Sequence, residues 1–406
     1  MVEIVVGVVF FAALVSLLAI FVLVARRFLV PQGECQITIN TRKKVTGAIG
    51  QRLLDLLARE EIRLPSACGG AGTCGLCKVR VLNGGGETGP QELAHLTKTE
   101  AANGVRLACQ VSALGAMAVE VDEASFGVQT WRCTVESTRN VSTLIREIVL
   151  RLPEGEEMDF RAGGFVQVTC PPYRVAYADF DIEDEYRDVW DRLALWRFEA
   201  RSEEPITRAY SMANHPGEKG VIVLNVRIAL PPPYAKGVPP GIVSSWLFGL
   251  QLGDAIEVMG PFGHFFVEDT EKEAVFIGGG AGMAPLRAQI LDLLETRQSK
   301  RKMTFWYGAR SKREVFYGDV FDALRADHDN FDWHVALSEP EPGDEWQGFT
   351  GFIHEVILDN YLEHHPAPED CEYYLCGPPL MVRAVLKMLD NLGVEPHGIH
   401  YDDFGG

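Results

Sequence analysis

The chain has 406 residues, 47% of them hydrophobic and 23% charged, and 38 Lys and Arg against 56 Asp and Glu give a net charge of -18. This length and composition predict about two to four domains with ordinary packed cores. The acidic balance argues against a nucleic-acid partner, because phosphate backbones are bound by basic surfaces. The nine cysteines are an odd and clustered set, which favours an intracellular metal or redox role over a disulfide framework.

An uncharged and mostly apolar segment opens the chain at residues 4–25. As a helix it spans about 33 Å, enough for a hydrocarbon core of about 30 Å. Arg26 and Arg27 follow, and the positive-inside rule places them and the later residues on the cytoplasmic side. A cleaved signal peptide would need a basic start, a shorter apolar run and a small-residue cleavage site. We therefore expect an uncleaved transmembrane anchor at residues 1–30.

A cysteine-rich loop marks the first soluble domain, which we expect at residues 33–127. Three cysteines follow the pattern Cys68-x5-Cys74-x2-Cys77, and Cys109 comes after 31 intervening residues. A 2Fe–2S cluster needs four thiolates, and plant-type ferredoxins supply them as a tight loop of three plus one distant cysteine. The first spacing here is one residue longer than in those ferredoxins. A zinc site is the alternative, but zinc ribbons usually show two close cysteine pairs, and one C-x2-C occurs here.

Short strands separated by turn residues predict a small β-barrel at residues 130–268. An insert at residues 177–205 interrupts it. This insert is long and charged, with aromatic residues at Tyr186, Trp190 and Trp196. Such a segment is most often a surface excursion, and its length also permits a partner-docking role.

The motif at residues 208–214, RAYSMAN, has the side chains that a flavin dinucleotide needs. Arg208 offers a bidentate clamp for phosphate, and Tyr210 offers a flat stacking partner. Ser211 adds a polar contact. Taken singly, Arg208 and Tyr210 are equally compatible with an ordinary strand surface, so the prediction rests on their combination.

A second group of candidate cofactor ligands follows the motif. Residues 241–247 open a helix, and Ser244 with the helix N–H groups would complete a pyrophosphate site. The simpler interpretation of Ser244 is an N-cap. Two further candidates for cofactor binding lie on a predicted strand at residues 221–228: Asn225 and Arg227.

Alternating strands and helices predict a parallel α/β sheet at residues 270–406. A glycine-rich turn follows its first strand and opens a helix, the context that a dinucleotide-binding turn requires. The candidate nucleotide-binding residues of this turn are Gly279, Gly280, Gly282, Met283 and Pro285.

The end of this domain offers two more candidates. Cys376-Gly377-Pro378 follows another strand, and a small polarizable side chain there would suit a place beside the nicotinamide. The alternative is a buried cysteine before a turn. Phe404, near the end of the chain, would cover the flavin, and the alternative for it is a frayed tail.

The residues leave the choice between NADH and NADPH open. Arg310, Ser311, Lys312 and Arg313 follow a predicted strand, where basic side chains would hold a 2′-phosphate. Glu314 would oppose that role.

Together these features resemble known families. Residues from about 130 to 406 resemble the ferredoxin–NADP⁺ reductase superfamily, and residues 33–127 resemble a β-grasp ferredoxin domain. With the anchor, the five-residue cysteine spacing, RAYSMAN, the acidic insert and the YDDFGG ending, the whole chain resembles the family of F subunits of Na⁺-translocating NADH:quinone reductases. The implied fold is multidomain α+β and α/β: transmembrane helix, β-grasp ferredoxin domain, FAD-binding β-barrel and parallel-sheet NAD-binding domain.

The resemblance also implies roles for the candidate residues. Arg208 would bind FAD phosphate, Tyr210 would stack on the isoalloxazine, and Ser211 would lie near N5. Ser244 would hold the pyrophosphate, Phe404 would cover the flavin, and Cys376 would lie near the nicotinamide. The 2Fe–2S cluster would be bound by Cys68, Cys74, Cys77 and Cys109.

The implied activity is NADH oxidation by hydride transfer to FAD, followed by single-electron transfer to the 2Fe–2S cluster. Electrons would continue to flavins on partner subunits and to ubiquinone, at a bacterial inner membrane, with the soluble domains on the cytoplasmic side. Sodium transport would belong to the assembled complex. One alternative is a membrane-tethered NADH reductase component that feeds an oxygenase, and another is a non-enzymatic assembly protein.

Overall fold

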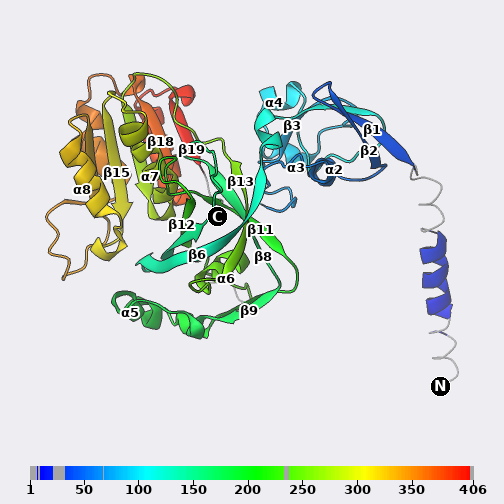
Figure 1. The fold of residues 1–406 in the computed structure, drawn as a ribbon, viewed down its shortest axis with the longest axis horizontal. Helices are drawn as coiled ribbons and strands as arrows, with labels where there is room; N and C mark the ends of the chain where they lie inside the picture. Colours follow the sequence, from blue (N-terminus) through cyan, green and yellow to red (C-terminus); the bar gives the residue numbers. More distant parts are fainter. Residues whose placement is uncertain (1–6, 8–9, 22–32, 67, 233–236, 403–406) are drawn as a thin grey trace. The chain divides into compact units, whose positions relative to one another are not determined.

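The computed structural model describes residues 7, 10–21, 33–66, 68–232 and 237–402. The chain divides into two compact units, Met1–Phe126 and Gly127–Gly406 (Figure 1).

Residues 10–21 of the first unit are helical, and apolar side chains such as Phe10 and Leu17 are exposed. In the described part of the chain, no helix combines the length and the apolar character that crossing a bilayer requires. The expected anchor at residues 1–30 extends over residues 1–6, 8–9 and 22–30, which lie outside the described residues.

A five-stranded mixed sheet forms the rest of the first unit, in the order β2-β1-β5-β3-β4. Strand β1 alternates exposed and buried residues, so Cys35, Ile37 and Ile39 all face the core. Helix α2 buries Leu53, Leu56 and Leu57 in the same core. The strands are β1 (Glu34–Ile39), β2 (Lys43–Ala48), β3 (Lys78–Asn83), β4 (Val105–Leu107) and β5 (Met117–Glu120), and the helices are α2 (Leu53–Arg59), α3 (Pro90–Leu93), α4 (Lys98–Ala102) and the 3-10 helix η1 (Glu123–Phe126).

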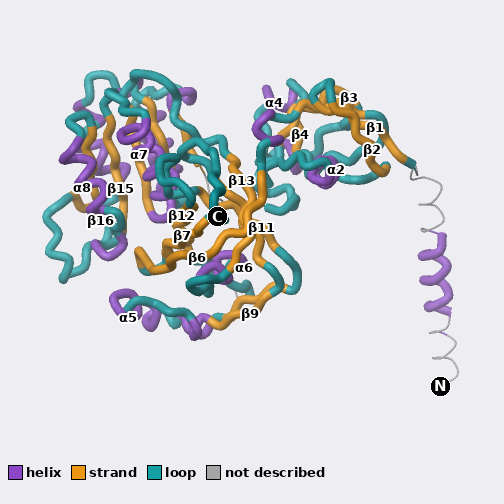
Figure 2. The backbone as a smooth tube through the Cα atoms, in the orientation of Figure 1, coloured by secondary structure: helices purple, strands orange, loops and turns teal. Residues whose placement is uncertain are grey.

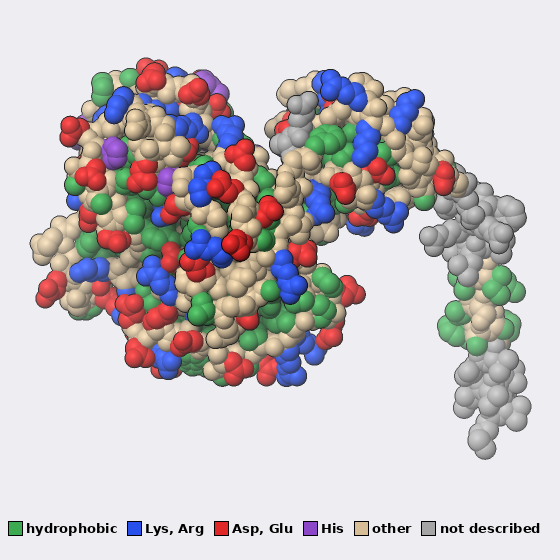
Figure 3. Space-filling model, in the orientation of Figure 1, with side chains coloured by type: hydrophobic (Ala, Val, Ile, Leu, Met, Phe, Trp, Pro, Cys, Tyr) green, Lys and Arg blue, Asp and Glu red, His purple; other side chains and the backbone are tan. Residues whose placement is uncertain are grey.

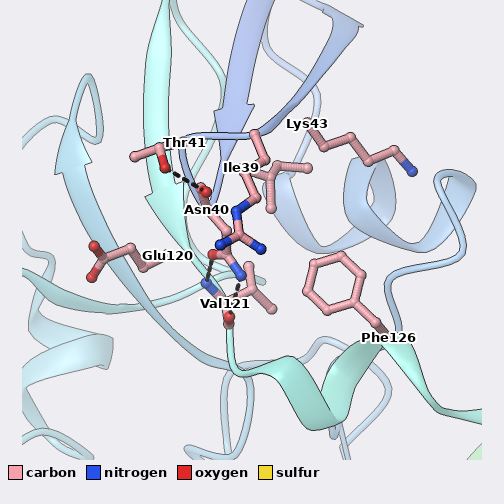
Figure 4. Close-up of a pocket in the computed structure, with 8 residues that line it drawn as sticks. Ile39, Asn40, Thr41, Lys43, Glu120, Val121 and Phe126 are labelled. Carbon is pink, nitrogen blue, oxygen red and sulfur yellow. Dashed lines mark hydrogen bonds between the residues drawn. The ribbon is translucent and has the colours of Figure 1, made fainter.

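A hollow of about 580 Å³ lies on this unit, beside the turn that joins β1 to β2 (Figure 4). The Asn40 amide closes its floor by donating to the Val121 carbonyl at 2.8 Å and accepting from the Val121 N–H at 2.7 Å. Phe126 forms one wall, and the cysteines of the loop at residues 68–77 do not line it.

An antiparallel six-stranded sheet begins the second unit, in the order β11-β8-β13-β6-β7-β12. A bridge between Met212 and Leu224 joins the ends of its two outer strands, so the sheet closes into a barrel. The strands are β6 (Gln129–Ser142), β7 (Ile145–Arg151), β8 (Phe165–Cys170), β11 (Ile206–Ser211), β12 (Val221–Arg227) and β13 (Ala255–Phe262), and α6 (Ile242–Phe248) packs among them.

The insert is folded onto the barrel, which differs from a simple surface excursion. Its helix α5 (Asp184–Arg192) turns Tyr186 and Trp190 inward, and both belong to the barrel core. The Trp190 indole N–H donates to the Thr143 carbonyl at 2.8 Å. Its other elements are η2 (Tyr177–Asp179), η3 (Leu195–Arg197) and β10 (Glu199–Ser202). Strand β10 pairs with β9 (Tyr173–Ala176), which directly precedes the insert.

A parallel six-stranded sheet completes the second unit, in the order β17-β16-β15-β14-β18-β19 (Figure 2). Successive residues of β14 face opposite sides: Phe276 packs with α7 and α8, and Ile277 packs with α9 and α10. The strands are β14 (Ala274–Gly279), β15 (Met303–Ala309), β16 (Phe331–Leu337), β17 (Phe349–Thr350), β18 (Glu372–Cys376) and β19 (Ile399–Asp402); the helices are η4 (Gly280–Gly282), α7 (Met283–Leu291), η5 (Asp292–Thr296), η6 (Lys312–Glu314), α8 (Gly318–Asp327), α9 (Ile353–Asn360), η7 (Leu362–His364), η8 (Pro368–Asp370), α10 (Pro379–Asn391) and η9 (Pro396–Gly398).

Candidate functional site

The four candidate cluster ligands, Cys68, Cys74, Cys77 and Cys109, form two close pairs in the first unit. The Sγ atoms of Cys68 and Cys74 are 3.3 Å apart. Cys77 and Cys109 share a side-chain hydrogen bond. The Cys77 carbonyl also accepts the Ala108 N–H at 2.8 Å, which ties the loop to the strand that leads to Cys109.

Positive φ angles let the backbone wrap around this site. Gly70 has a φ of +87°, and its N–H donates to the Ser66 hydroxyl at 2.9 Å. Gly72 has a φ of +80°, and a Cβ there would lie 2.5 Å from the Gln110 side chain. Glycine is the residue that adopts this conformation without steric cost, which explains the glycine content of the loop.

One thiol of each pair ionises easily. Burial raises the pKa of Cys68, but hydrogen bonds from neighbouring backbone N–H groups, first that of Thr73, outweigh it and bring the pKa to about 6. The hydrogen bond from Cys77 lowers the pKa of Cys109 to about 6. The pKa of Cys77 is raised by the same bond and then by burial. Thiolates are the ligands that iron requires, so the loop favours metal binding.

The arrangement fits a 2Fe–2S cluster better than a single zinc ion. A four-cysteine zinc site gathers all its sulfurs around one ion at about 2.3 Å. Among the described residues, no three of these four sulfurs lie within 4.8 Å of one another. Two separate pairs match two irons with two thiolates each.

A buried ion pair supports the segment before Cys109. Arg106 Nη2 lies 2.7 Å from Glu92 Oε2, and both side chains are almost fully buried. Glu92 also accepts the N–H groups of Gly89 at 2.9 Å and Leu107 at 3.0 Å. Sequence reasoning missed this pair, because nothing in the spacing of two charged residues indicates that they pair inside a core.

In the second unit, β11 places Arg208 and Tyr210 at different depths. Arg208 is exposed, and its guanidinium donates to the neighbouring Thr207 carbonyl at 2.7 Å. Tyr210 is partly buried, and burial raises the pKa of its phenol, which therefore stays neutral. An exposed guanidinium beside a neutral aromatic ring fits the phosphate and the ring of a flavin dinucleotide.

Ser211 is buried at the end of the same strand and meets the last described residue of the chain. Its hydroxyl donates to Asp402 Oδ2 at 3.5 Å, and His264 Nε2 lies 3.7 Å from Asp402 Oδ1. Asp402 is paired with Cys376 across β19 and β18. The structure thus brings the flavin motif, the Cys376 turn and the C-terminal strand together. Phe404 lies outside the described residues.

His264 and Asp402 were not among the candidates from the sequence. Asp402 stands two residues before Phe404 in the terminal segment, so its position near the end of the chain was the available signal. His264 is not part of any short sequence motif, because its partner, Asp402, lies far away in the sequence.

The second group of flavin candidates is already engaged within the protein. The Ser244 hydroxyl donates to the Gly241 carbonyl and accepts the Ala229 N–H, both at 3.2 Å. The Asn225 amide donates to the Tyr317 hydroxyl at 2.8 Å, and its buried Oδ1 has no hydrogen-bond partner among the described residues. That orphaned acceptor suits a polar group of a bound cofactor.

Arg227 lies at the end of β12, where it is exposed. Desolvation of its guanidinium lowers its pKa and the nearby Arg310 lowers it further, whereas the Glu314 carboxylate raises it.

The glycine-rich turn after β14 permits a close approach of two strand ends. A Cβ on Gly282 would lie 2.0 Å from the Cys376 carbonyl oxygen, and one on Gly279 would lie 3.2 Å from the Gly308 carbonyl oxygen. Gly280 has a φ of +55°. Met283 and Pro285 are buried in the first turns of α7. In α/β sheets, ligands bind at the carboxyl ends of the strands, where this turn lies.

Cys376 is fully buried and is followed by the turn at Gly377 and Pro378. A Cβ on Gly377 would lie 2.9 Å from the Gly279 carbonyl oxygen, so this turn packs directly against the glycine-rich one. The two turns therefore lie side by side at the carboxyl ends of their strands, as a nicotinamide site requires.

A further cluster of potential metal ligands, Glu273, His365 and Cys371, is held by other partners. Lys302 Nζ lies 3.3 Å from the Glu273 carboxylate. His365 Nε2 lies 3.2 Å from the Glu273 carboxylate, and Nδ1 accepts the Ala367 N–H at 3.3 Å. These contacts join the three residues to the surrounding structure.

Three family models match consecutive parts of the chain. The 2Fe-2S iron-sulfur cluster binding domain matches residues 37–114, the oxidoreductase FAD-binding domain matches residues 195–267, and the oxidoreductase NAD-binding domain matches residues 276–387. The cofactors of the chain are therefore a 2Fe–2S cluster and FAD, and its substrate is NADH.

Two solved structures are similar over most of the chain. The Amycolatopsis cytochrome P450 reductase GcoB is 25% identical, with a TM-score of 0.65 over 91% of this chain and 98% of that one. The ferredoxin reductase in carbazole 1,9a-dioxygenase is 24% identical, with a TM-score of 0.58 over 92% and 99%, and supports the fold alone.

Curated relatives match the chain from end to end. The F subunit of the Na⁺-translocating NADH-quinone reductase of Neisseria meningitidis serogroup C is 54% identical over 404 residues, covering 100% of both chains. The protein of the same name from Methylococcus capsulatus is 54% identical over 407 residues, again covering 100% of both. The chain belongs to the family of F subunits of Na⁺-translocating NADH-quinone reductases.

Proposed function

We propose that this chain is the electron-input subunit of a Na⁺-translocating NADH:quinone reductase. The observation that carries the proposal is the full-length identity of 54% to relatives of that name, together with the three cofactor domains in one chain. When bound, FAD accepts a hydride from NADH and releases electrons singly, the form in which a 2Fe–2S cluster accepts them. Electrons then leave for the flavins of partner subunits and for ubiquinone.

The residues of β11 orient the flavin in this proposal. Arg208 binds phosphate through its exposed guanidinium, and Tyr210 stacks on the ring system. Ser211 and Asp402 hold a hydrogen bond at the point where the flavin motif meets the Cys376 turn. Ser244, Asn225 and Phe404 remain proposed flavin contacts, the last on the resemblance alone.

The two turns at the sheet edge position the nicotinamide nucleotide. Gly279, Gly280 and Gly282 leave room for phosphates at the start of α7, where Met283 and Pro285 pack behind the turn. Arg227 supplies positive charge from the barrel side. Cys376, Gly377 and Pro378 complete the edge.

The paired thiols hold the cluster. Cys68 and Cys74 bind one iron, and Cys77 and Cys109 bind the other, because each pair is already close. The deep burial of Cys77 and Cys109 keeps bulk water from these ligands.

Residues 1–30 anchor the chain to the bacterial inner membrane by one helix, with residues 33–406 on the cytoplasmic side. The uncharged run at residues 4–25 and the arginines after it support this part of the proposal. The alternative, an NADH reductase component that feeds an oxygenase, shares the fold with solved oxygenase-system reductases, but their identity of 25% or less is far below that of the quinone reductase relatives.

Replacing one cluster ligand separates the two halves of the proposed activity. We expect Cys68→Ser in the full chain to retain NADH-to-ferricyanide activity, because the second unit is untouched, and to lose transfer to quinone in the assembled complex. Cys35→Ser, which changes a buried cysteine of the same unit outside the loop, is the matched control and should retain both. Loss of flavin reduction in Cys68→Ser would contradict the proposed order of electron transfer.

A further inference from the structure

The barrel and the parallel sheet of the second unit meet where helix α7 packs against the flavin motif. Ala284 of α7 belongs to one small buried cluster with Ala213 and Val223 of the barrel. Helix α7 begins directly after the glycine-rich turn, and Ala213 is part of the RAYSMAN motif. This contact therefore joins the helix proposed to bind the nicotinamide nucleotide to the motif proposed to bind the flavin.

Arg287, one turn further along α7, bonds to the same part of the barrel. Its Nη1 donates to the Ala213 carbonyl at 2.6 Å, and both terminal nitrogens lie 3.2 Å from the Glu218 carboxylate. Acidic and basic side chains are interspersed over the face of this unit in Figure 3, and exposed ion pairs contribute little. Arg287 differs from such surface cations, because its side chain is only 12% exposed.

Tyr317, which directly precedes α8, makes a second contact from the parallel-sheet domain to the barrel. Its hydroxyl accepts from the Asn225 amide at 2.8 Å and donates to the Glu147 carboxylate at 2.5 Å. Asn225 of β12 and Glu147 of β7 pair across these two strands. Burial, and then the charge of Glu147, raise the pKa of the Tyr317 phenol, which therefore keeps the proton that it donates.

The two contacts are coupled through the side chains themselves. The Arg287 guanidinium lies over the Tyr317 ring, 4.9 Å from its centroid. Tyr317 also has a φ of +61°, in the left-handed region that bulky residues rarely adopt. Such a conformation persists where the surroundings hold it, and the bonds to Asn225 and Glu147 provide that hold.

We propose that Arg287 and Tyr317 are positioning residues, which hold the parallel-sheet domain against the barrel so that the nicotinamide reaches the flavin at hydride-transfer distance. In that step a hydride leaves C4 of NADH and bonds to N5 of FAD, so NADH is oxidised to NAD⁺ and FAD is reduced to FADH⁻. The reacting atoms must approach to about 3–3.5 Å, and a displacement of about 1 Å costs on the order of 10²-fold in rate. The inference rests on the proposed hydride transfer and names the residues that set its geometry.

Anaerobic stopped-flow reduction of the full-length, FAD-loaded chain by NADH tests this proposal in Tyr317→Phe, which removes the hydroxyl and keeps the ring. We expect the rate constant of flavin reduction at saturating NADH to fall at least about tenfold, because the approach geometry is lost. The Kd for NAD⁺ should stay within about threefold. The charge-transfer absorbance between reduced flavin and NAD⁺, which depends on overlap of the two rings, should weaken.

Arg287 provides an independent test of the same role. Arg287→Gln should also lower the rate constant and the charge-transfer absorbance, because it removes the ion pair with Glu218. Arg287→Lys should restore part of both, since an ammonium still donates to the Ala213 carbonyl or to Glu218.

Tyr361→Phe is the matched control. The Tyr361 hydroxyl also donates to a carboxylate, that of Glu273, but both residues belong to the parallel-sheet domain. This variant should keep the rate constant within about twofold and leave the charge-transfer absorbance unchanged.

Wild-type rate constants and charge-transfer absorbance in both Tyr317→Phe and Arg287→Gln would overturn this inference alone. Losses that merely follow the loss of bound FAD or of folded protein would also overturn it, because they indicate a stabilising role only. A wild-type chain whose flavin is not reduced by NADH would overturn the proposed function as well.

Discussion

At the scale of single residues, Arg106 and Glu92 illustrate how a buried charge supports a site that it does not touch. Their ion pair is surrounded by backbone partners: Glu92 accepts two N–H groups, and Arg106 donates to the carbonyls of Gly85 at 2.8 Å and Glu87 at 2.9 Å. The network joins the loop before α3 to the strand that carries Leu107. These bonds therefore fix the segment that leads to Cys109.

Glu92→Gln should destabilise the first unit by about 3–5 kcal/mol, since it leaves Arg106 as an uncompensated buried charge. Chemical unfolding, monitored through the absorbance of the cluster, measures this loss of stability. The control is Lys78→Ala, which breaks an exposed ion pair with Glu100 and should lower the free energy of unfolding by no more than about 1 kcal/mol. Burial raises the pKa of Glu92, but the Arg106 and backbone hydrogen bonds outweigh it and lower the pKa below its ordinary value. The pair's contribution is therefore present above the unfolded pKa of about 4.3 and lost as pH falls through the lowered one. Equal costs for the two variants would contradict this account.

At the scale of elements, the turn after β14 and the turn after β18 depend on the absence of one side chain. A Cβ on Gly282 would meet the Cys376 carbonyl oxygen at 2.0 Å, and that neighbour is backbone, which cannot move aside cheaply. Gly282→Ala should cost at least about 1–3 kcal/mol in free energy of unfolding and weaken NAD⁺ binding. Gly343→Ala, at an open position, should stay within about 0.5 kcal/mol. Matching effects of the two variants would refute the close approach.

The insert gives the second prediction at this scale. Trp190 is fully buried against Phe248 and Tyr177 in the barrel core. Trp190→Ala should therefore lower the free energy of unfolding by about 3–5 kcal/mol, whereas Trp196→Ala, at a partly exposed position, should lower it by less. The flavin fluorescence that is released on unfolding measures both changes. A Trp190 variant as stable as the wild type would mean that α5 is dispensable for the barrel.

At the scale of the whole molecule, the family and the cofactors predicted from the sequence are confirmed, because local motifs carried them. The cysteine spacing, RAYSMAN and the glycine-rich turn each lie within a few residues, where the chemistry shows in the letters. The roles of the individual residues stay predictions. The membrane helix was expected at residues that the structure describes only in part.

Contacts between distant residues could not be predicted. Ser211 and Asp402 meet across 191 positions, and hydrophobic periodicity reports which way a side chain faces but not which distant residue it will meet. The insert was a different case: Tyr186 and Trp190 are four residues apart, on one face of a helix, so their spacing already indicated a buried face. The many charged residues of the insert favoured a surface segment instead.

An anaerobic NADH titration of the full chain, followed by absorbance and by EPR, tests most directly whether one chain carries hydride oxidation and a one-electron exit. We predict bleaching of the flavin absorbance, followed by the rhombic EPR signal of a reduced 2Fe–2S cluster. Flavin bleaching without that signal, with zinc instead of iron bound at Cys68, Cys74, Cys77 and Cys109, would contradict the account by removing the electron exit.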